Sequence, residues 1–230
     1  MEIICPQSPF IESVDELLRE LARVDFFAHG LLIGSWPMAI YTQHFELAYG
    51  LMTNDIDFAI ENVLKIKEGK PLPELLERLG YTPVQDYSGI ETFIQGTFEV
   101  EFIVHRRGGS GPSAVTVPPW KVAAQPLPFI DLLFIRPVSV VVDDFNLRIP
   151  APETLMLHKL IIAQRRLGRD REAKKEKDLQ QCTALAEIVR VGEVKQILLS
   201  YRLSKKVCTE IECSCDEAGL SMQSLGIFWT

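Results

Sequence analysis

The chain has 230 residues, a formal net charge of −7 at pH 7 and an apolar fraction of 47%. This length suits one large domain or a core with a smaller second domain, and the apolar fraction allows a substantial buried core. The negative charge argues against broad nonspecific binding to nucleic acid, because lysines and arginines supply that affinity. No run of eighteen apolar residues occurs and the start lacks the basic end of a secretory signal, so we expect a cytoplasmic protein without a membrane span.

The first predicted elements are a helix over residues 12–23 and a buried strand over residues 26–33, which ends at Gly34 and Ser35. Pro37 follows, and proline is tolerated in the first turn of a helix, so the pattern is strand, tight turn and helix. Such a turn presents backbone N–H groups and a hydroxyl at the positive end of a helix. We therefore expect Gly34 and Ser35 to bind a phosphate.

Two carboxylates stand close together in the next predicted strand, which contains the run Thr53-Asn54-Asp55-Ile56-Asp57-Phe58. Side chains alternate in an extended strand, so Asp55 and Asp57 share one face and the apolar side chains share the other. A pair of acids aimed at one spot suits a divalent cation such as Mg²⁺, which prefers carboxylate oxygens. The alternative is an edge strand with a solvated acidic face.

The region after the acid pair predicts a short helix over residues 73–79 and strands near 81–86, 90–95 and 97–105. The last of these strands alternates, with Glu99 and Glu101 on the same face. Either residue can supply a third carboxylate from a separate strand, and Glu101 is favoured because Val100, Phe102 and Ile103 flank it.

Residues 108–128 are rich in proline and glycine and are predicted to form a surface loop. The segment from 105 to 112 is a weaker candidate for a phosphate cradle, because no predicted helix follows it. Residues 129–135 and 138–142 are further strand candidates, and residues 143–146 are predicted to form a turn. From Pro152 onward the pattern is helical, so we place a core domain in residues 1–150 and a helical domain in residues 151–230.

Two charged residues fall on mostly apolar faces of the predicted C-terminal helices, namely Lys159 and Asp178. Burial of an unpaired charge is costly, so each should have a partner or a ligand. Lys159 is predicted to bind a phosphate, and Asp178 to orient Lys159 or Arg169; the alternative for each is a structural ion pair or a side chain that reaches solvent. The basic run at 165–177 is either a solvated connection or a basic rim for a nucleotide or an RNA acceptor.

The five cysteines make an odd number without the spacing of a disulfide framework, so we expect reduced thiols. Cys208, Cys213 and Cys215 have no histidine nearby as a fourth zinc ligand. Their pattern favours a helical segment that contains small apolar sulfur groups.

The Gly34-Ser35 turn, the Asp55-x-Asp57 pair and the later strand acid together resemble the nucleotidyltransferase superfamily that includes polymerase beta and the aminoglycoside nucleotidyltransferases. The resemblance extends over about residues 25–185, because later segments resemble the helical part of bacterial abortive-infection nucleotidyltransferase toxins. Those segments are Pro152-Glu153-Thr154-Leu155, Lys159-Leu160, Arg169 and Lys177-Asp178-Leu179. The departure is a glutamate as the third acid, where aspartate is more usual.

This resemblance implies an α/β (α+β) fold, with a mixed sheet flanked by helices and a helical C-terminal domain. It implies that Gly34 and Ser35 hold the triphosphate of an NTP and that Asp55, Asp57 and Glu101 hold two Mg²⁺ ions. The implied reaction moves a nucleoside monophosphate to a hydroxyl acceptor, which is a small molecule, a protein side chain or an RNA end. The alternatives are a catalytically silent binding module and a toxin restrained by an antitoxin-like partner protein.

Overall fold

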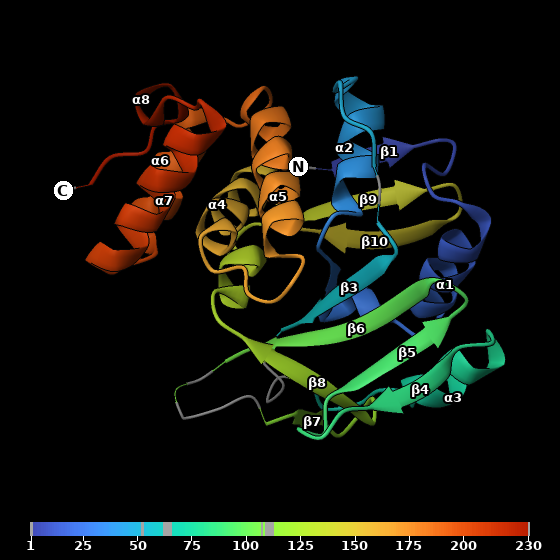
Figure 1. The fold of residues 1–230 in the computed structure, drawn as a ribbon. Coiled ribbons are helices and arrows are strands. Elements are labelled where there is room, and N and C mark those ends of the chain that lie inside the picture. Colours follow the sequence, from blue (N-terminus) through green and yellow to red (C-terminus); the bar gives the residue numbers. More distant parts are fainter. Residues whose placement is uncertain (1, 52, 62–65, 107, 109–112, 230) are drawn as a thin grey trace. The chain divides into compact units, whose positions relative to one another are not determined.

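The computed structural model describes residues 2–51, 53–61, 66–106, 108 and 113–229 (Figure 1). Contacts within the chain divide it into two compact units. The sheet unit comprises Met1–His44 and Gly50–Pro150, and the helical unit comprises Phe45–Tyr49 and Ala151–Thr230.

The sheet unit contains a three-stranded sheet, in the order β1-β9-β10, and a larger sheet with the order β2-β3-β6-β5-β4, which β8 and β7 extend from β6. In the larger sheet β3, β6 and β8 are parallel, while β2 and β5 run antiparallel to their neighbours. This mixed sheet with flanking helices confirms the predicted fold class. The strands are β1 (Glu2–Cys5), β2 (Gly30–Leu32), β3 (Asp55–Ile60), β4 (Thr82–Gln85), β5 (Glu91–Gln95), β6 (Phe98–His105), β7 (Val115–Val117), β8 (Val122–Leu127), β9 (Val138–Val142) and β10 (Phe145–Ile149).

Among the described residues, the α-helices that accompany these strands are α1 (Glu12–Arg23), α2 (Pro37–Phe45) and α3 (Leu72–Arg78). The helix predicted over 12–23 is confirmed. Its apolar residues recur at three- and four-residue spacing, and this stripe is fully buried, which explains why the helix forms here. The buried residues of the stripe are Val14, Leu17, Leu18 and Leu21.

An aromatic core lies on the side of the larger sheet opposite the acids. The ring centroid of Phe26 is 5.3 Å from that of Phe58, 5.9 Å from that of Phe102 and 4.7 Å from that of Trp120. Phe26 reaches this position because Phe26–Ala28 forms a 3-10 helix (η1), so the strand predicted over 26–33 is limited to β2. A Cβ on Gly30 would lie 2.2 Å from the Phe26 ring, so the ring folds back over this glycine.

Two predictions for the middle of the chain are wrong, and the turn predicted over residues 143–146 is limited to Asp143 and Asp144, because β10 begins at Phe145. The supposed loop at 108–128 contains β7 and β8, and β8 alternates buried and half-buried residues as a strand with one covered face should. Residues 129–135 are not a strand, because Ile130–Phe134 forms a 3-10 helix (η3) flanked by left-handed residues at Phe129 and Arg136. This helix packs Ile130 and Leu133 into an apolar cluster with Ala59 and Ile103.

The helical unit contains α4 (Pro152–Ala163), α5 (Arg171–Ala186), α6 (Val191–Ser200), α7 (Lys205–Ala218) and α8 (Met222–Leu225). Helix α4 is central, because it contacts α5, α6 and α7 and eleven of its twelve residues are buried. The amide of Gln181 donates to the hydroxyl of Tyr49 over 2.6 Å, which ties the segment Phe45–Tyr49 to this unit. In the described ranges, every helix is too short or too polar to cross a bilayer.

Candidate active site

Four carboxylates share one face of two neighbouring strands, β3 and β6. The parallel register places Asp55 opposite Glu99 and Asp57 opposite Glu101. Asp55, Asp57 and Glu101 are half-buried, whereas Glu99 is exposed. The predicted acids are therefore adjacent, and burial separates the two candidates for the third acid.

Farther along the same face the side chains become apolar, because Ala59 and Ile103 follow the acids and η3 covers them. The acidic patch thus occupies only the first half of the two strands. Along β6, Glu101 is therefore followed on this face by the apolar cluster, and across the strands it lies opposite Asp57.

The environment of Glu101 favours its protonated form. Burial, together with the charges of Asp57, Asp55 and Glu99, raises the pKa of this carboxyl to about 7. The hydroxyl of Thr92 on β5 lies 3.4 Å from Oε1 and opposes the shift by donating to the carboxylate. A bound cation would favour the ionised form.

The turn at Gly34 lies directly against this acidic face. The N–H of Ile33 donates to the carbonyl of Asp57 over 2.9 Å, and Gly34 has a φ of +68°. A Cβ on Gly34 would lie 2.2 Å from Oδ2 of Asp57, so both the backbone conformation and the close approach require glycine. Ser35 is 5% exposed, and its carbonyl accepts from the N–H of Met38 at the start of α2.

Trp36 ties the turn to the first acid, a contact that sequence reasoning missed. Its indole N–H donates to the backbone carbonyl of Asp55 over 2.9 Å, and the side chain is 4% exposed. The only signal in the sequence is a large aromatic residue directly after the Gly-Ser turn. Thr92 was missed as well, because its contact with Glu101 depends on strand pairing.

The family profile described as "Nucleotidyltransferase" matches residues 12–201. The chain belongs to this nucleotidyltransferase family. Among solved structures, an antigenic nucleotidyltransferase-like protein from Paracoccidioides brasiliensis is similar in fold, with a TM-score of 0.52 and 14% sequence identity over 93% of this chain and 89% of that one. A structure described as a tRNA-processing enzyme (apo form I) gives a TM-score of 0.35 and 15% identity, over 97% of this chain and 62% of that one. Comparison with curated proteins gives no match.

The acidic face of this nucleotidyltransferase suits a hard divalent cation in its donor chemistry, because carboxylate oxygens are the ligands that Mg²⁺ prefers. Burial raises the pKa of Glu101, and the negative charges of Asp57, Asp55 and Glu99 raise it further. Across the described part of the chain, no three side chains of His, Cys, Asp or Glu already converge as a ligand set. Binding of Mg²⁺ by Asp55, Asp57 and Glu101 stays a prediction.

Lys159 lies in the helical unit of the nucleotidyltransferase, inside an ion-pair cluster. Its Nζ is 3.1 Å from Oδ1 of Asp178, and the two side chains are 2% and 0% exposed. The Nε of Arg166 donates to the other oxygen of Asp178 over 2.7 Å. Asp178 thus holds Lys159, as the sequence suggested, while the contact of Lys159 with a nucleotide stays a prediction.

Two weaker candidates lie elsewhere. In the supposed phosphate cradle at 105–112, residues 107 and 109–112 lie outside the described part of the chain, and Nδ1 of His105 is 3.0 Å from Asp131. The three cysteines of α7 are free thiols that differ in exposure: Cys208 is half-buried, Cys213 is exposed and Cys215 is buried.

Proposed function

We propose that this nucleotidyltransferase moves a nucleoside monophosphate from an NTP to a hydroxyl acceptor in a Mg²⁺-dependent reaction. Membership of the family supports nucleotidyl transfer in general. The observation that carries the finer proposal is the contact between the Gly34 turn and the carboxylate of Asp57. Because of this contact, a turn of the kind that binds phosphate lies next to a carboxylate of the kind that binds cations.

In this proposal the backbone N–H groups around Gly34 and the hydroxyl of Ser35 bind the phosphates of the NTP. Asp55, Asp57 and Glu101 would hold Mg²⁺, which when bound supplies charge neutralisation on the phosphates and activation of the acceptor oxygen. The acceptor oxygen forms a bond to the α-phosphorus, and the bond to pyrophosphate breaks. In the same proposal Glu101 accepts the proton of the acceptor hydroxyl.

The test is a transfer assay with each of the four NTPs, labelled at the α-phosphate, incubated with cell extract and purified protein. Label that appears in a small molecule, a protein or an RNA identifies the acceptor class. Asp55→Asn and Asp57→Asn should abolish transfer, whereas Asp216→Asn, at an exposed site on α7, should leave it unchanged. Nucleotide binding without transfer under all conditions would instead support the silent binding module.

Two matched variants test which glutamate is the third acid. Glu101→Gln should remove at least about 99% of activity, because general acid–base groups typically contribute a hundredfold or more. Glu99→Gln changes an exposed carboxylate on the same strand face and should lower activity severalfold at most. The reverse order of the two effects would assign the role to Glu99.

A further inference from the structure

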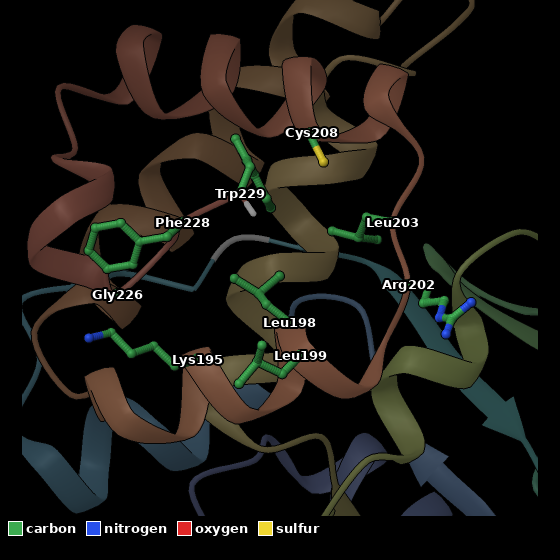
Figure 2. A pocket seen from close by; sticks show the side chains of 9 residues that line it. All are labelled: Lys195, Leu198, Leu199, Arg202, Leu203, Cys208, Gly226, Phe228 and Trp229. Carbon is green, nitrogen blue, oxygen red and sulfur yellow. The ribbon is translucent and has the colours of Figure 1, made fainter.

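A groove with a volume of about 610 Å³ lies within the helical unit (Figure 2). None of its lining residues belongs to the strands that carry the acids. It is lined by residues of α6, of the connection from α6 to α7, of α7 at Cys208, and of the segment that follows α8. This volume falls within the range of small-molecule sites, which is roughly 300–1,000 Å³. The proposed nucleotidyl transfer does not use it.

Apolar side chains form the middle of the groove. Leu198, Leu199, Leu203 and Phe228 all line it, and Leu199 is 76% exposed while Phe228 is 50% exposed (Figure 2). Single exposed apolar residues are common on protein surfaces, but a contiguous set of them marks an interaction site.

The C-terminal wall of the groove is held in place by two contacts. Gly226 has a φ of +74°, and a Cβ there would lie 2.7 Å from Cγ1 and 2.8 Å from the carbonyl oxygen of Val191, so this segment packs closely on the start of α6. The indole N–H of Trp229 donates to Oε1 of Glu212 on α7 over 2.6 Å. The wall is therefore fixed against both helices that border the groove.

Two cations stand at opposite ends of the apolar row, Lys195 and Arg202 (Figure 2). The Nζ of Lys195 is 5.0 Å from the centroid of the Phe228 ring. As far as the described residues go, neither cation forms an ion pair with a carboxylate. A protein with a net charge of −7 thus places two cations without carboxylate partners beside its exposed apolar groove.

We propose that this groove binds a small amphipathic anion. The apolar body of the ligand lies on the leucines and Phe228, where its burial removes apolar surface from water. The acidic group of the ligand meets Arg202 or Lys195, whose charges select an anion over an uncharged molecule of the same shape.

Cys208 and Cys213 provide the readout, with dodecanoate below its micelle concentration as the probe. Cys208 lines the groove, whereas Cys213 is exposed on the same helix and does not line it. Thiol modification of the full chain is followed by mass spectrometry of the labelled peptides. Saturating dodecanoate should slow modification of Cys208 at least tenfold and leave that of Cys213 unchanged, and dodecanol should need at least tenfold higher concentration.

Two variants test the apolar and the charged parts separately. Leu199→Glu should weaken dodecanoate binding more than tenfold, while the control Leu167→Glu, at an 87% exposed position outside the groove, should not. Replacement of both Lys195 and Arg202 by glutamine should reduce the affinity for dodecanoate to that for dodecanol. Circular dichroism and melting curves establish that each variant is folded.

Three results would overturn the proposal. The first is equal affinity for dodecanoate and dodecanol, and the second is unchanged affinity in folded Leu199→Glu. The third is a dimer of the free protein in light scattering that already protects Cys208, since a second copy would then cover the groove. Because the readout is binding, none of these results depends on whether nucleotidyl transfer occurs.

Discussion

At the scale of single residues, Glu101 should make the stability of the metal-free protein depend on pH. Its folded-state pKa of about 7 lies above the usual value of 4.5, so the folded chain binds more protons than the unfolded chain between these values. The free energy of unfolding is therefore highest below about pH 5, and it falls by roughly 1–3 kcal/mol as the pH rises to about 8.

Urea unfolding in the presence of a chelator measures this slope. Glu101→Gln should remove the part of the slope that this carboxyl causes, because glutamine does not titrate. Glu99→Gln should reduce it only slightly, because the charge of Glu99 raises the pKa of Glu101 less than the charges of Asp57 and Asp55 do. A slope that is the same in wild type and Glu101→Gln would contradict the raised pKa.

Gly34 offers a second residue-scale prediction, with Gly96 as a matched control. Both glycines have a left-handed φ, +68° and +59°, but a Cβ meets Asp57 at Gly34 and nothing within 4 Å at Gly96. Gly96→Ala should cost about 1 kcal/mol of unfolding free energy, the conformational cost alone. Gly34→Ala should cost more and should also abolish NTP binding, as measured by denaturation and calorimetry.

At the scale of elements, Lys159 links α4 to α5 through Asp178. Loss of one partner from a buried ion pair costs about 3–5 kcal/mol, because the other charge stays buried. Arg166 still contacts Asp178, so we expect Lys159→Gln to lower the unfolding free energy by a value at the lower end of this range. Lys174→Gln on the exposed face of α5 should have almost no effect.

The same pair of variants tests the predicted nucleotide contact of Lys159. An NTP affinity that falls in Lys159→Gln, measured well below its melting temperature, would support a phosphate contact. An unchanged affinity together with lower stability would make Lys159 a purely structural residue.

The elements that sequence predicted correctly are those with local causes. The stripe of α1 and the alternation around Asp55 and Asp57 follow from neighbouring residues alone. β1 was missed because it forms only by pairing in parallel with β9, as Glu2 does with Ser139 far along the chain. The apolar run at 129–135 is compatible with a strand, and only its packing over Ala59 and Ile103 explains why it is η3.

The same division applies to the candidate site. Residue types and spacing were enough to single out Gly34, Asp55, Asp57 and Glu101. The backbone carbonyl that Trp36 contacts and the hydroxyl that faces Glu101 have no signature in the sequence, because both contacts arise from folding.

At the scale of the whole molecule, metal binding should appear as a change in global stability. Like charges repel on the acidic face, so Asp57→Asn should raise the melting temperature of the metal-free protein. In the wild type, Mg²⁺ at about a hundred times its dissociation constant should stabilise the folded state by about 2.7 kcal/mol, or roughly 5–10 °C for a chain of this size. Asp57→Asn should lose most of this gain, whereas Asp216→Asn should keep it. Differential scanning calorimetry with and without Mg²⁺ measures the six melting temperatures of the three proteins. An equal gain in wild type and Asp57→Asn would place the cation elsewhere, because a site that includes this carboxylate cannot retain its affinity once the charge is removed.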